Sequence, residues 1–186
     1  MEFQEFDGLF PFPEMRTSQH LALEKFVEVT NKDRKYTILE LPTGVGKSGI
    51  AVTLGRWAGR QGGAYLLTIQ KMLQTQYMNE FEQDIDELKG AANYRCHCYP
   101  TTCEQGAKIA KMDGKVCSDC PYKCAKEQFI QGRFGLTNFA YFCSGVANQK
   151  SLFGKRKLLL IDEAHNTEQT LINHSNIEIT KLRLQE

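Results

Sequence analysis

A short glycine-rich segment constrains the fold of this chain more than any other feature. Residues 40–48 read Glu-Leu-Pro-Thr-Gly-Val-Gly-Lys-Ser, between a β-rich run over Tyr36–Leu41 and a helical pattern over 47–60. Such a loop can aim consecutive backbone N–H groups at a phosphate, while the positive end of the following helix attracts the charge. The segment therefore predicts a phosphate-binding loop in an α/β domain with parallel strands.

Within this loop, small residues would let the backbone approach a phosphate, and two side chains would supply specific contacts. Gly44 and Gly46 lack the Cβ that would block the approach. Lys47 would reach the β- and γ-phosphates of ATP, and Ser48 would hold Mg²⁺ through its hydroxyl. The generic pattern GxxxxGK[ST] has glycine where this chain has Leu41. The alternative is a tight turn with a solvated lysine, but the position between a strand and a helix favours the nucleotide loop.

A second cluster of polar residues follows an apolar run near the end of the chain. Asp162 and Glu163 come directly after Lys157–Ile161, which we predict to be a central, parallel strand. Both carboxylates are then expected at the carboxyl edge of the sheet, where ligands of open α/β folds bind. Asp162 would hold Mg²⁺ through water. Glu163 would polarise the water that attacks the γ-phosphate, and His165 would couple the site to neighbouring elements. The alternative is a helix cap with acidic residues near the dipole, and the presence of the loop favours the Mg²⁺ site over it.

Composition limits the kinds of protein that this chain can be. Its 186 residues suffice for one α/β domain with a buried sheet and a small insertion, and 23 Lys and Arg against 22 Asp and Glu give a net charge of +1. The acidic N-terminus shows no secretory signal, and the longest aliphatic run, Leu158–Ile161, is far shorter than the roughly 20 residues that span a bilayer. We expect an intracellular protein, cytoplasmic or nuclear, that has no contact with a membrane.

Hydrophobic periodicity predicts the remaining elements. No regular pattern is visible from Gly90 to about Tyr122, so something other than an apolar core must hold that stretch. The expected helices cover 17–31, 47–60, 70–84, 124–131 and 139–148, and the expected strands cover 36–41, 64–69, 134–137 and 157–161.

Most of the seven cysteines lie in the stretch without periodicity. In a reducing compartment they indicate metal ligands rather than disulfides. Four thiolates bind either Zn²⁺ or an iron–sulphur cluster, and spacing alone leaves both open because only 117–120 is a CxxC pair. A redox dithiol at that pair, or free buried thiols, are further alternatives. The cysteines are Cys96, Cys98, Cys103, Cys117, Cys120, Cys124 and Cys143.

The same stretch is locally basic. Between residues 88 and 133 eight basic residues face four acidic ones, a local charge of +4, and Tyr94, Tyr99 and Tyr122 are interleaved with them. This composition suits phosphate neutralisation and base stacking on single-stranded DNA, for which Lys108, Lys111 and Lys115 are candidates. The alternative is an ordinary solvated surface.

Several segments together resemble the XPD/DinG family of superfamily 2 DNA helicases, which carry an iron–sulphur cluster in the first motor domain. The resemblance covers about Phe10 to Asn166, and it explains Leu41, because the family's loop has no glycine there. The matching segments are Phe10-Pro11-Phe12-Pro13 with Arg16 and Gln19, the loop Glu40–Ser48, the run around Thr68, Leu73 and Gln76, Asn93-Tyr94-Arg95-Cys96, Cys120-Pro121-Tyr122, and Asp162-Glu163-Ala164-His165-Asn166.

The resemblance implies a P-loop NTPase fold of RecA type, with a parallel sheet flanked by helices and a small Cys-rich insertion. It also implies ATP, Mg²⁺ and a 4Fe–4S cluster as cofactors, with Zn²⁺ as the alternative to the cluster. Single-stranded or forked DNA would be the partner, with movement from 5′ to 3′. The implied cluster ligands are Cys96, Cys117 and Cys120, with Cys103 favoured over Cys98 and Cys124 as the fourth. The implied nucleotide contacts are Gln19, Thr43, Gly44, Val45, Gly46, Lys47 and Ser48.

On this basis we predict three parts. Residues 1–87 would form the first part of a motor domain, 88–126 the iron–sulphur insertion and 127–186 the rest of that domain. The family's second motor domain would have to come from elsewhere, so we expect weak nucleotide binding and little hydrolysis from these residues alone. Two other functions stay open: an incomplete nucleic-acid-binding module or half of a split enzyme, and a P-loop ATPase with a zinc-binding insertion.

Overall fold

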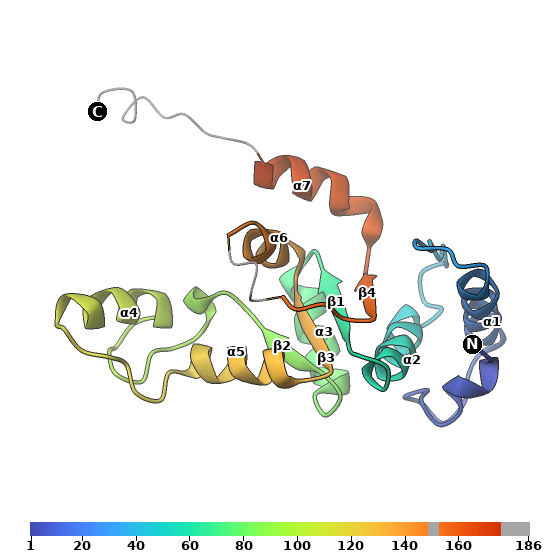
Figure 1. The fold of residues 1–186 in the computed structure, drawn as a ribbon, viewed down its shortest axis with the longest axis horizontal. Coiled ribbons are helices and arrows are strands. Elements are labelled where there is room, and N and C mark those ends of the chain that lie inside the picture. Colours follow the sequence, from blue (N-terminus) through green and yellow to red (C-terminus); the bar gives the residue numbers. More distant parts are fainter. Residues whose placement is uncertain (149–152, 176–186) are drawn as a thin grey trace.

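A computed structural model describes residues 1–148 and 153–175 and shows a parallel β-sheet covered by helices on both faces (Figure 1). The strand order is β2-β3-β1-β4, and all three pairings are parallel. The strands are β1 (Ala64–Thr68), β2 (Asp86–Leu88), β3 (Phe134–Asn138) and β4 (Leu158–Ile161). The α-helices are α1 (Thr17–Asn31), α2 (Lys47–Gly59), α3 (Lys71–Phe81), α4 (Cys103–Met112), α5 (Pro121–Gln131), α6 (Phe139–Asn148) and α7 (Thr167–Ser175). Short 3₁₀ helices cover Phe3–Phe6, Ala91–Asn93 and Ala164–Asn166.

Side chains of β1 alternate between two hydrophobic clusters, one on each face of the sheet. Leu66 packs with Trp57 of α2 and Phe81 of α3, in a cluster that also includes α1. On the opposite face, Tyr65 and Leu67 pack with side chains of α5 and α6. Because a strand points successive side chains to opposite faces, a strand buried on both sides reads as a continuous apolar run. The predicted α/β fold with a parallel sheet flanked by helices is confirmed.

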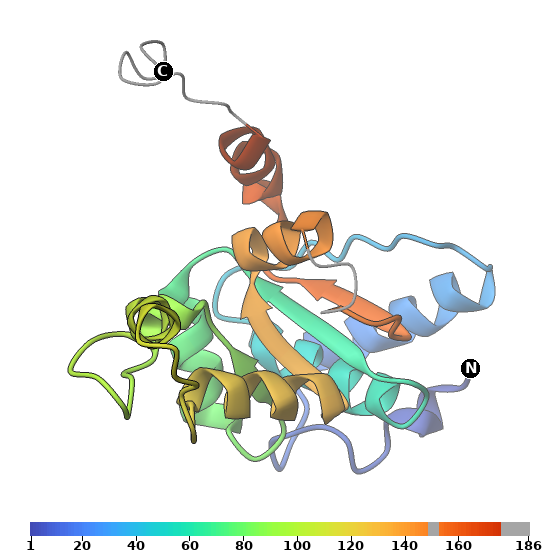
Figure 2. The same ribbon diagram turned by 60° about the vertical axis from the view of Figure 1, so that its left-hand side comes forward.

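The register of the strands brings their carboxyl ends to one edge of the sheet. Ala64 is aligned with Phe134 of β3 and with Leu158 of β4, so these three strands start together and end within one residue of each other. Residues that follow β1 and β4 therefore lie side by side, although the sequence separates them widely. The amino ends of the same strands form the opposite edge, where the turn after α2 and the end of α5 meet (Figure 2).

Two expectations about strands are wrong. Residues 36–41 form no strand but an extended segment, in which Leu39 and Leu41 pack against the core while Tyr36 and Ile38 are 81% and 91% accessible. Within the described residues β4 pairs only with β1, so it is an edge strand rather than a central one, and Leu159 and Ile161 are exposed. A β-rich run becomes a strand only when a neighbour takes up its hydrogen bonds, and nothing described here does so for 36–41.

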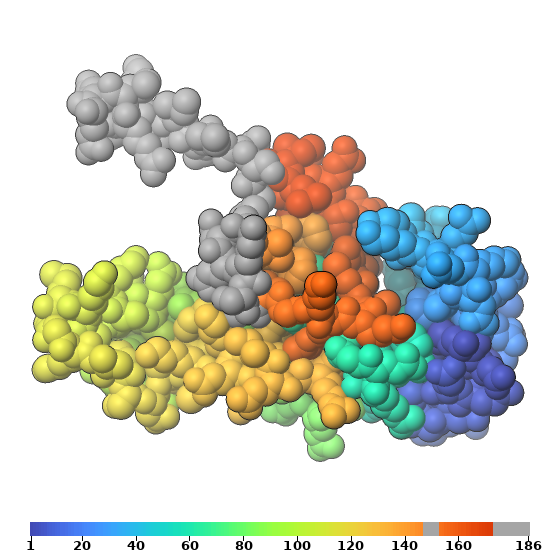
Figure 3. Space-filling model, viewed as in Figure 1, coloured from blue at the N-terminus to red at the C-terminus, as the bar shows by residue number. Residues whose placement is uncertain are grey.

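The cysteine-rich stretch contains more regular structure than its sequence predicts. Helix α4 begins after Thr102, whose hydroxyl accepts a hydrogen bond from the Gln105 N–H, and the stretch protrudes as a lobe to one side of the sheet (Figure 3). β2 and α7 are further elements that periodicity did not reveal. The end of the predicted third part, residues 176–186, lies outside the described residues. Within the described chain, no helix combines the length and the apolar character needed to cross a bilayer.

Candidate functional site

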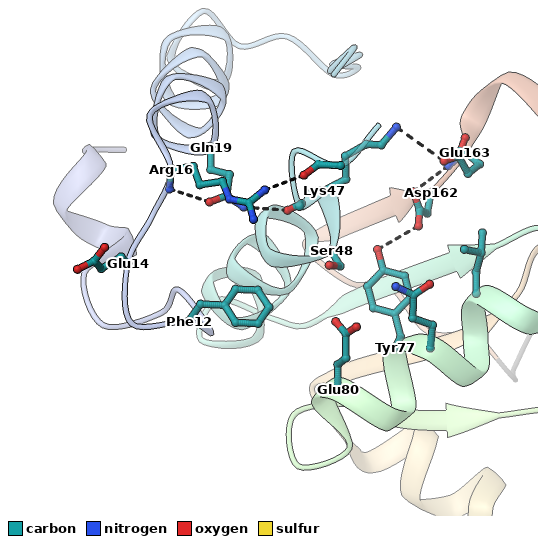
Figure 4. A pocket seen from close by; sticks show the side chains of 14 residues that line it. Phe12, Glu14, Arg16, Gln19, Lys47, Ser48, Tyr77, Glu80, Asp162 and Glu163 are labelled. Carbon is teal, nitrogen blue, oxygen red and sulfur yellow. Dashed lines mark hydrogen bonds and ion pairs between the residues drawn. The ribbon is translucent and has the colours of Figure 1, made fainter. Parts of the chain in front are cut away.

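A cavity of about 430 Å³ opens at the carboxyl edge of the sheet (Figure 4). It lies between the phosphate-loop candidate, the acidic pair that follows β4 and one face of α3. The segment before α1 closes another side. The lining residues are Phe12, Glu14, Arg16, Gln19, Gly44, Gly46, Lys47, Ser48, Leu73, Gln76, Tyr77, Glu80, Asp162 and Glu163.

The upstream segment holds the glycine loop in place. Gly44 and Gly46 both have left-handed backbones, with φ of 82° and 84°. Arg16 donates a hydrogen bond to the Gly44 carbonyl at 2.7 Å, and the Gln19 amide donates one to the Gly46 carbonyl at 3.1 Å. A Cβ on Gly46 would come within 2.5 Å of the Gln19 amide nitrogen and would displace it, and the left-handed backbone also favours glycine there. In this structure Gln19 positions the loop, and its predicted contact with nucleotide stays a prediction.

Lys47 connects the two halves of the cavity. It is the first residue of α2, where the positive end of the helix dipole lies. Its ammonium donates to the Leu41 carbonyl at 3.3 Å and lies 3.7 Å from the carboxylate of Glu163. Ser48 lines the cavity beside it. A phosphate placed between this helix end and Lys47 would meet concentrated positive charge.

A tight turn presents the two acids. The Asp162 N–H donates to the Leu67 carbonyl at 2.9 Å, which extends the pairing of β4 with β1 by one residue. Glu163 has a left-handed backbone with φ of 53°, and its N–H donates to an Asp162 carboxylate oxygen at 3.0 Å. The other oxygen of Glu163 lies 3.2 Å from Nδ1 of His165. Glu163 therefore stands between Lys47 and His165.

Tyr77 is a site residue that the sequence analysis did not identify. Its hydroxyl donates to the carboxylate of Asp162 at 3.0 Å, and its side chain is almost fully buried. Burial, followed by the negative charge of Asp162, raises the pKa of Tyr77 well above its usual value, so the hydroxyl stays a donor. The sequence signal that could have identified Tyr77 is its helical spacing from Leu73 and Glu80. All three side chains of α3 face the cavity.

Three of the residues predicted for the nucleotide and Mg²⁺ site do not line the cavity. Thr43 is exposed and Val45 half-buried, and both belong to the loop without facing its inner side. His165 is exposed and reaches the site only through Glu163. The cavity brings together all the other residues predicted for nucleotide and Mg²⁺. These are Gln19, Gly44, Gly46, Lys47, Ser48, Asp162 and Glu163.

A family model described as type III restriction enzyme, res subunit, matches residues 12–184. The chain belongs to this family. The res subunit domain is the N-terminal motor domain of superfamily 2 helicases, so the protein is a helicase-type ATPase in general terms. ATP and Mg²⁺ are the expected ligands of such a domain, and nucleic acid is its expected partner. No curated protein matches the chain.

Five thiols of this res subunit domain form two groups of neighbours within the Cys-rich stretch. Cys96 and Cys117 are 3.9 Å apart between sulphurs, and Cys98 lies near the same pair. Cys103, at the start of α4, adjoins Cys120, the residue before α5. Cys124 is exposed on α5 and Cys143 half-buried on α6. No three His, Cys, Asp or Glu side chains of the described residues converge closely enough to form a metal-ion site.

The crowding of these thiols shifts their pKa values. Burial and the neighbouring thiols Cys98 and Cys96 raise the pKa of Cys117 to about 12. Burial also raises the pKa of Cys103, with Cys120 and Cys96 contributing. Burial alone would raise the pKa of Cys96, but backbone hydrogen bonds and the Cys117 thiol outweigh this effect, so the pKa of Cys96 is lowered. A negative charge on one sulphur therefore disfavours a charge on the next, and a bound cation would remove that repulsion.

Proposed function

We propose that this chain is the first motor domain of an ATP-dependent DNA helicase that moves 5′ to 3′ along a single strand. One observation carries the proposal: a single cavity at the carboxyl edge brings together Lys47, Ser48, Asp162 and Glu163. The two halves of a phosphoryl-transfer site thus meet in space.

Each of these residues has a role that its position supports. Lys47 and the first turn of α2 would neutralise the β- and γ-phosphates. Ser48 and Asp162 would hold Mg²⁺, and the hydrogen bond from Tyr77 would fix the orientation of the Asp162 carboxylate. Glu163 would orient and deprotonate the attacking water. His165, in contact with Glu163, would transmit the state of the site to the surface.

The motor proposed here needs further polypeptide. In the described residues the outer edge of β4 is unpaired, and the segment that leads into the phosphate loop lies outside the sheet with Tyr36 and Ile38 exposed. An additional strand paired with the free edge of β4 would reduce the exposure of Leu159 and Ile161. It would also restrict the movement of the phosphate loop. We propose that a second motor domain or partner chain supplies this support and the arginines that complete the site.

We also propose that the Cys-rich lobe, residues 88–126, holds a 4Fe–4S cluster on Cys96, Cys103, Cys117 and Cys120. Four thiolates are chemically the donor set of such a cluster or of Zn²⁺, and binding would have to draw the Cys96–Cys117 and Cys103–Cys120 neighbours together, since no three of these groups converge in the described residues. Gly106 of α4 faces the sulphur of Cys96, and a Cβ there would lie 2.5 Å from it. The absence of a side chain at Gly106 therefore leaves room for the buried Cys96 sulphur against α4. When bound, the cluster would tie α4 and α5 together.

Single-stranded DNA is the proposed partner of this lobe. Lys111 and Lys115 are exposed at the end of α4, and Lys108 lies one turn earlier, 3.1 Å from Glu104. Reversing the charge of all three should weaken single-strand binding and lower the slope of log affinity against log salt by about 2, at about 0.7 per phosphate contact. Hydrolysis stimulated by the strand should fall in parallel. Fluorescence anisotropy over a salt series measures the first effect.

A matched control reverses the charges of Lys32, Arg34 and Lys35, which follow α1. As in the α4 set, one of these lysines, Lys32, is paired with a glutamate one helical turn away. Affinity and salt slope should stay at the wild-type values in this control. Equal behaviour of the two triple variants would show that the α4 lysines are an ordinary solvated surface.

A further inference from the structure

A second cavity, of about 490 Å³, lies at the amino edge of the sheet, opposite the nucleotide cavity. The turn between α2 and β1, the turn between α5 and β3, and the residues before β4 form its wall. Five of the lining residues are glycines, so backbone forms much of the surface. The cationic lining residues are Arg60, Arg133, Lys155 and Arg156. The five residues of β1 put roughly 17 Å between the two edges.

The positive charge in this cavity is not balanced by neighbouring acids. In residues 1–148 and 153–175, no carboxylate lies within 4.0 Å of any of these four cations. The carboxylate of Asp86 lies against Gly132 in the cavity wall and attracts Arg156 at longer range. The C-terminal ends of α2 and α5 also point here, each equivalent to about half a negative charge. Four cations against one carboxylate and two helix ends leave a residual charge of about +2.

One of the four cations is fixed rigidly in the floor. Arg156 donates to the carbonyls of Ala64 at 2.7 Å and Phe129 at 2.6 Å, and its guanidinium lies 4.0 Å from the centre of the Tyr65 ring. Both carbonyl partners are neutral, so the charge of Arg156 persists in a half-buried position. Arg60, Arg133 and Lys155 are exposed around the rim and free to close on an anion.

We propose that this cavity binds the phosphates of a single nucleic-acid strand. Arg156 covers the buried ring of Tyr65, so that ring is not available to stack on a base, and the contact would be with phosphate regardless of sequence. Helix α5 favours a strand over a small anion. It runs about 16 Å from the thiols beside Cys120 to the cavity at Gln131, and Lys123 and Lys126 lie along it. A strand held at the Cys-rich lobe could thus continue to the amino edge of the sheet.

This inference does not depend on the nucleotide cavity, and its test uses no ATP. Changing Arg60, Arg133 and Lys155 together to glutamine, with Arg156 retained, should weaken binding of a labelled single-stranded oligonucleotide about tenfold. The slope against salt should fall by about 2, from three contacts at about 0.7 each. The control changes Lys32, Arg34 and Lys35 to glutamine, with the same loss of charge, and should bind like the wild type.

A second arm identifies the source of the phosphate. Calorimetric titration with inorganic pyrophosphate, before and after the triple substitution, reports on small anions. Loss of pyrophosphate binding with unchanged oligonucleotide binding would overturn the proposal in favour of a free polyphosphate. Unchanged binding of both pyrophosphate and oligonucleotide would also overturn the proposal. The cations would then only neutralise the negative ends of the α2 and α5 helix dipoles. Should the triple variant melt early, Lys155→Glu, in an exposed loop position, replaces it, and unchanged oligonucleotide affinity in that variant overturns the proposal.

Discussion

Replacing Glu163 by glutamine should leave nucleotide binding intact and reduce hydrolysis by about 10²- to 10³-fold. Glutamine has nearly the same size, so it can keep the turn after β4 and stay beside Lys47, but it cannot accept a proton from the attacking water. General-base catalysis contributes about 10²- to 10⁴-fold in enzymes, which sets the expected loss. Single-turnover hydrolysis of labelled ATP, with protein in excess, detects even a slow reaction.

The control for this variant is Glu168→Gln. Glu168 lies five residues further on, exposed in the first turn of α7, so the substitution removes one carboxylate from the same region without touching the cavity. Its hydrolysis rate should match the wild type within about twofold. If Glu163→Gln hydrolysed ATP as fast as this control, Glu163 would not be the base, and the acidic pair would be only a structural turn.

Replacing Cys103 by serine should remove the metal and unfold the Cys-rich lobe. Cys103 is 3% exposed, yet α4 contributes no side chain to either hydrophobic cluster that packs on the sheet. Metal binding of about 10 kcal/mol or more is typical of structural zinc sites, far more than the few buried residues of α4 can supply. We expect four irons per chain in anaerobically purified wild type, with broad visible absorption, and neither in the variant.

Limited proteolysis would show the structural consequence, since cleavage within 88–126 should accelerate when the metal is lost. Cys143→Ser is the control, because Cys143 lies on α6 and outside the thiol group. One zinc per chain without visible absorption would replace the iron–sulphur cluster by a zinc site. Wild-type protein free of both metals would contradict a metal-bound lobe altogether.

Local sequence predicted the elements that carry their own signal. The helix over 17–31 coincides with α1, and the strands over 64–69 and 134–137 lie within a residue of β1 and β3. The strand prediction for 36–41 was wrong because a strand depends on a pairing partner that the local sequence does not reveal. Helix α4 is amphipathic, but it was missed because its buried face consists of the small side chains Cys103, Gly106 and Ala110 rather than large apolar ones.

The same distinction applies to the candidate site. The glycine loop and the acidic pair carry their chemistry in short motifs, and the parallel sheet brings them together as expected. Tyr77 could not be predicted in its role, because its partner Asp162 is 85 residues away and only the fold makes them neighbours. The basic cavity was equally hidden, since its four cations come from three separate turns.

The most direct test of the nucleotide site is calorimetric titration of the full chain with Mg-ATP, comparing the wild type with Lys47→Ala and Lys35→Ala. Lys47 contacts both halves of the cavity, whereas Lys35 is exposed in the extended segment before the loop. We predict at least tenfold weaker binding for Lys47→Ala, about 1.4 kcal/mol or more, and an unchanged affinity for Lys35→Ala. Equal affinities in all three proteins would contradict a nucleotide site at the carboxyl edge of the sheet.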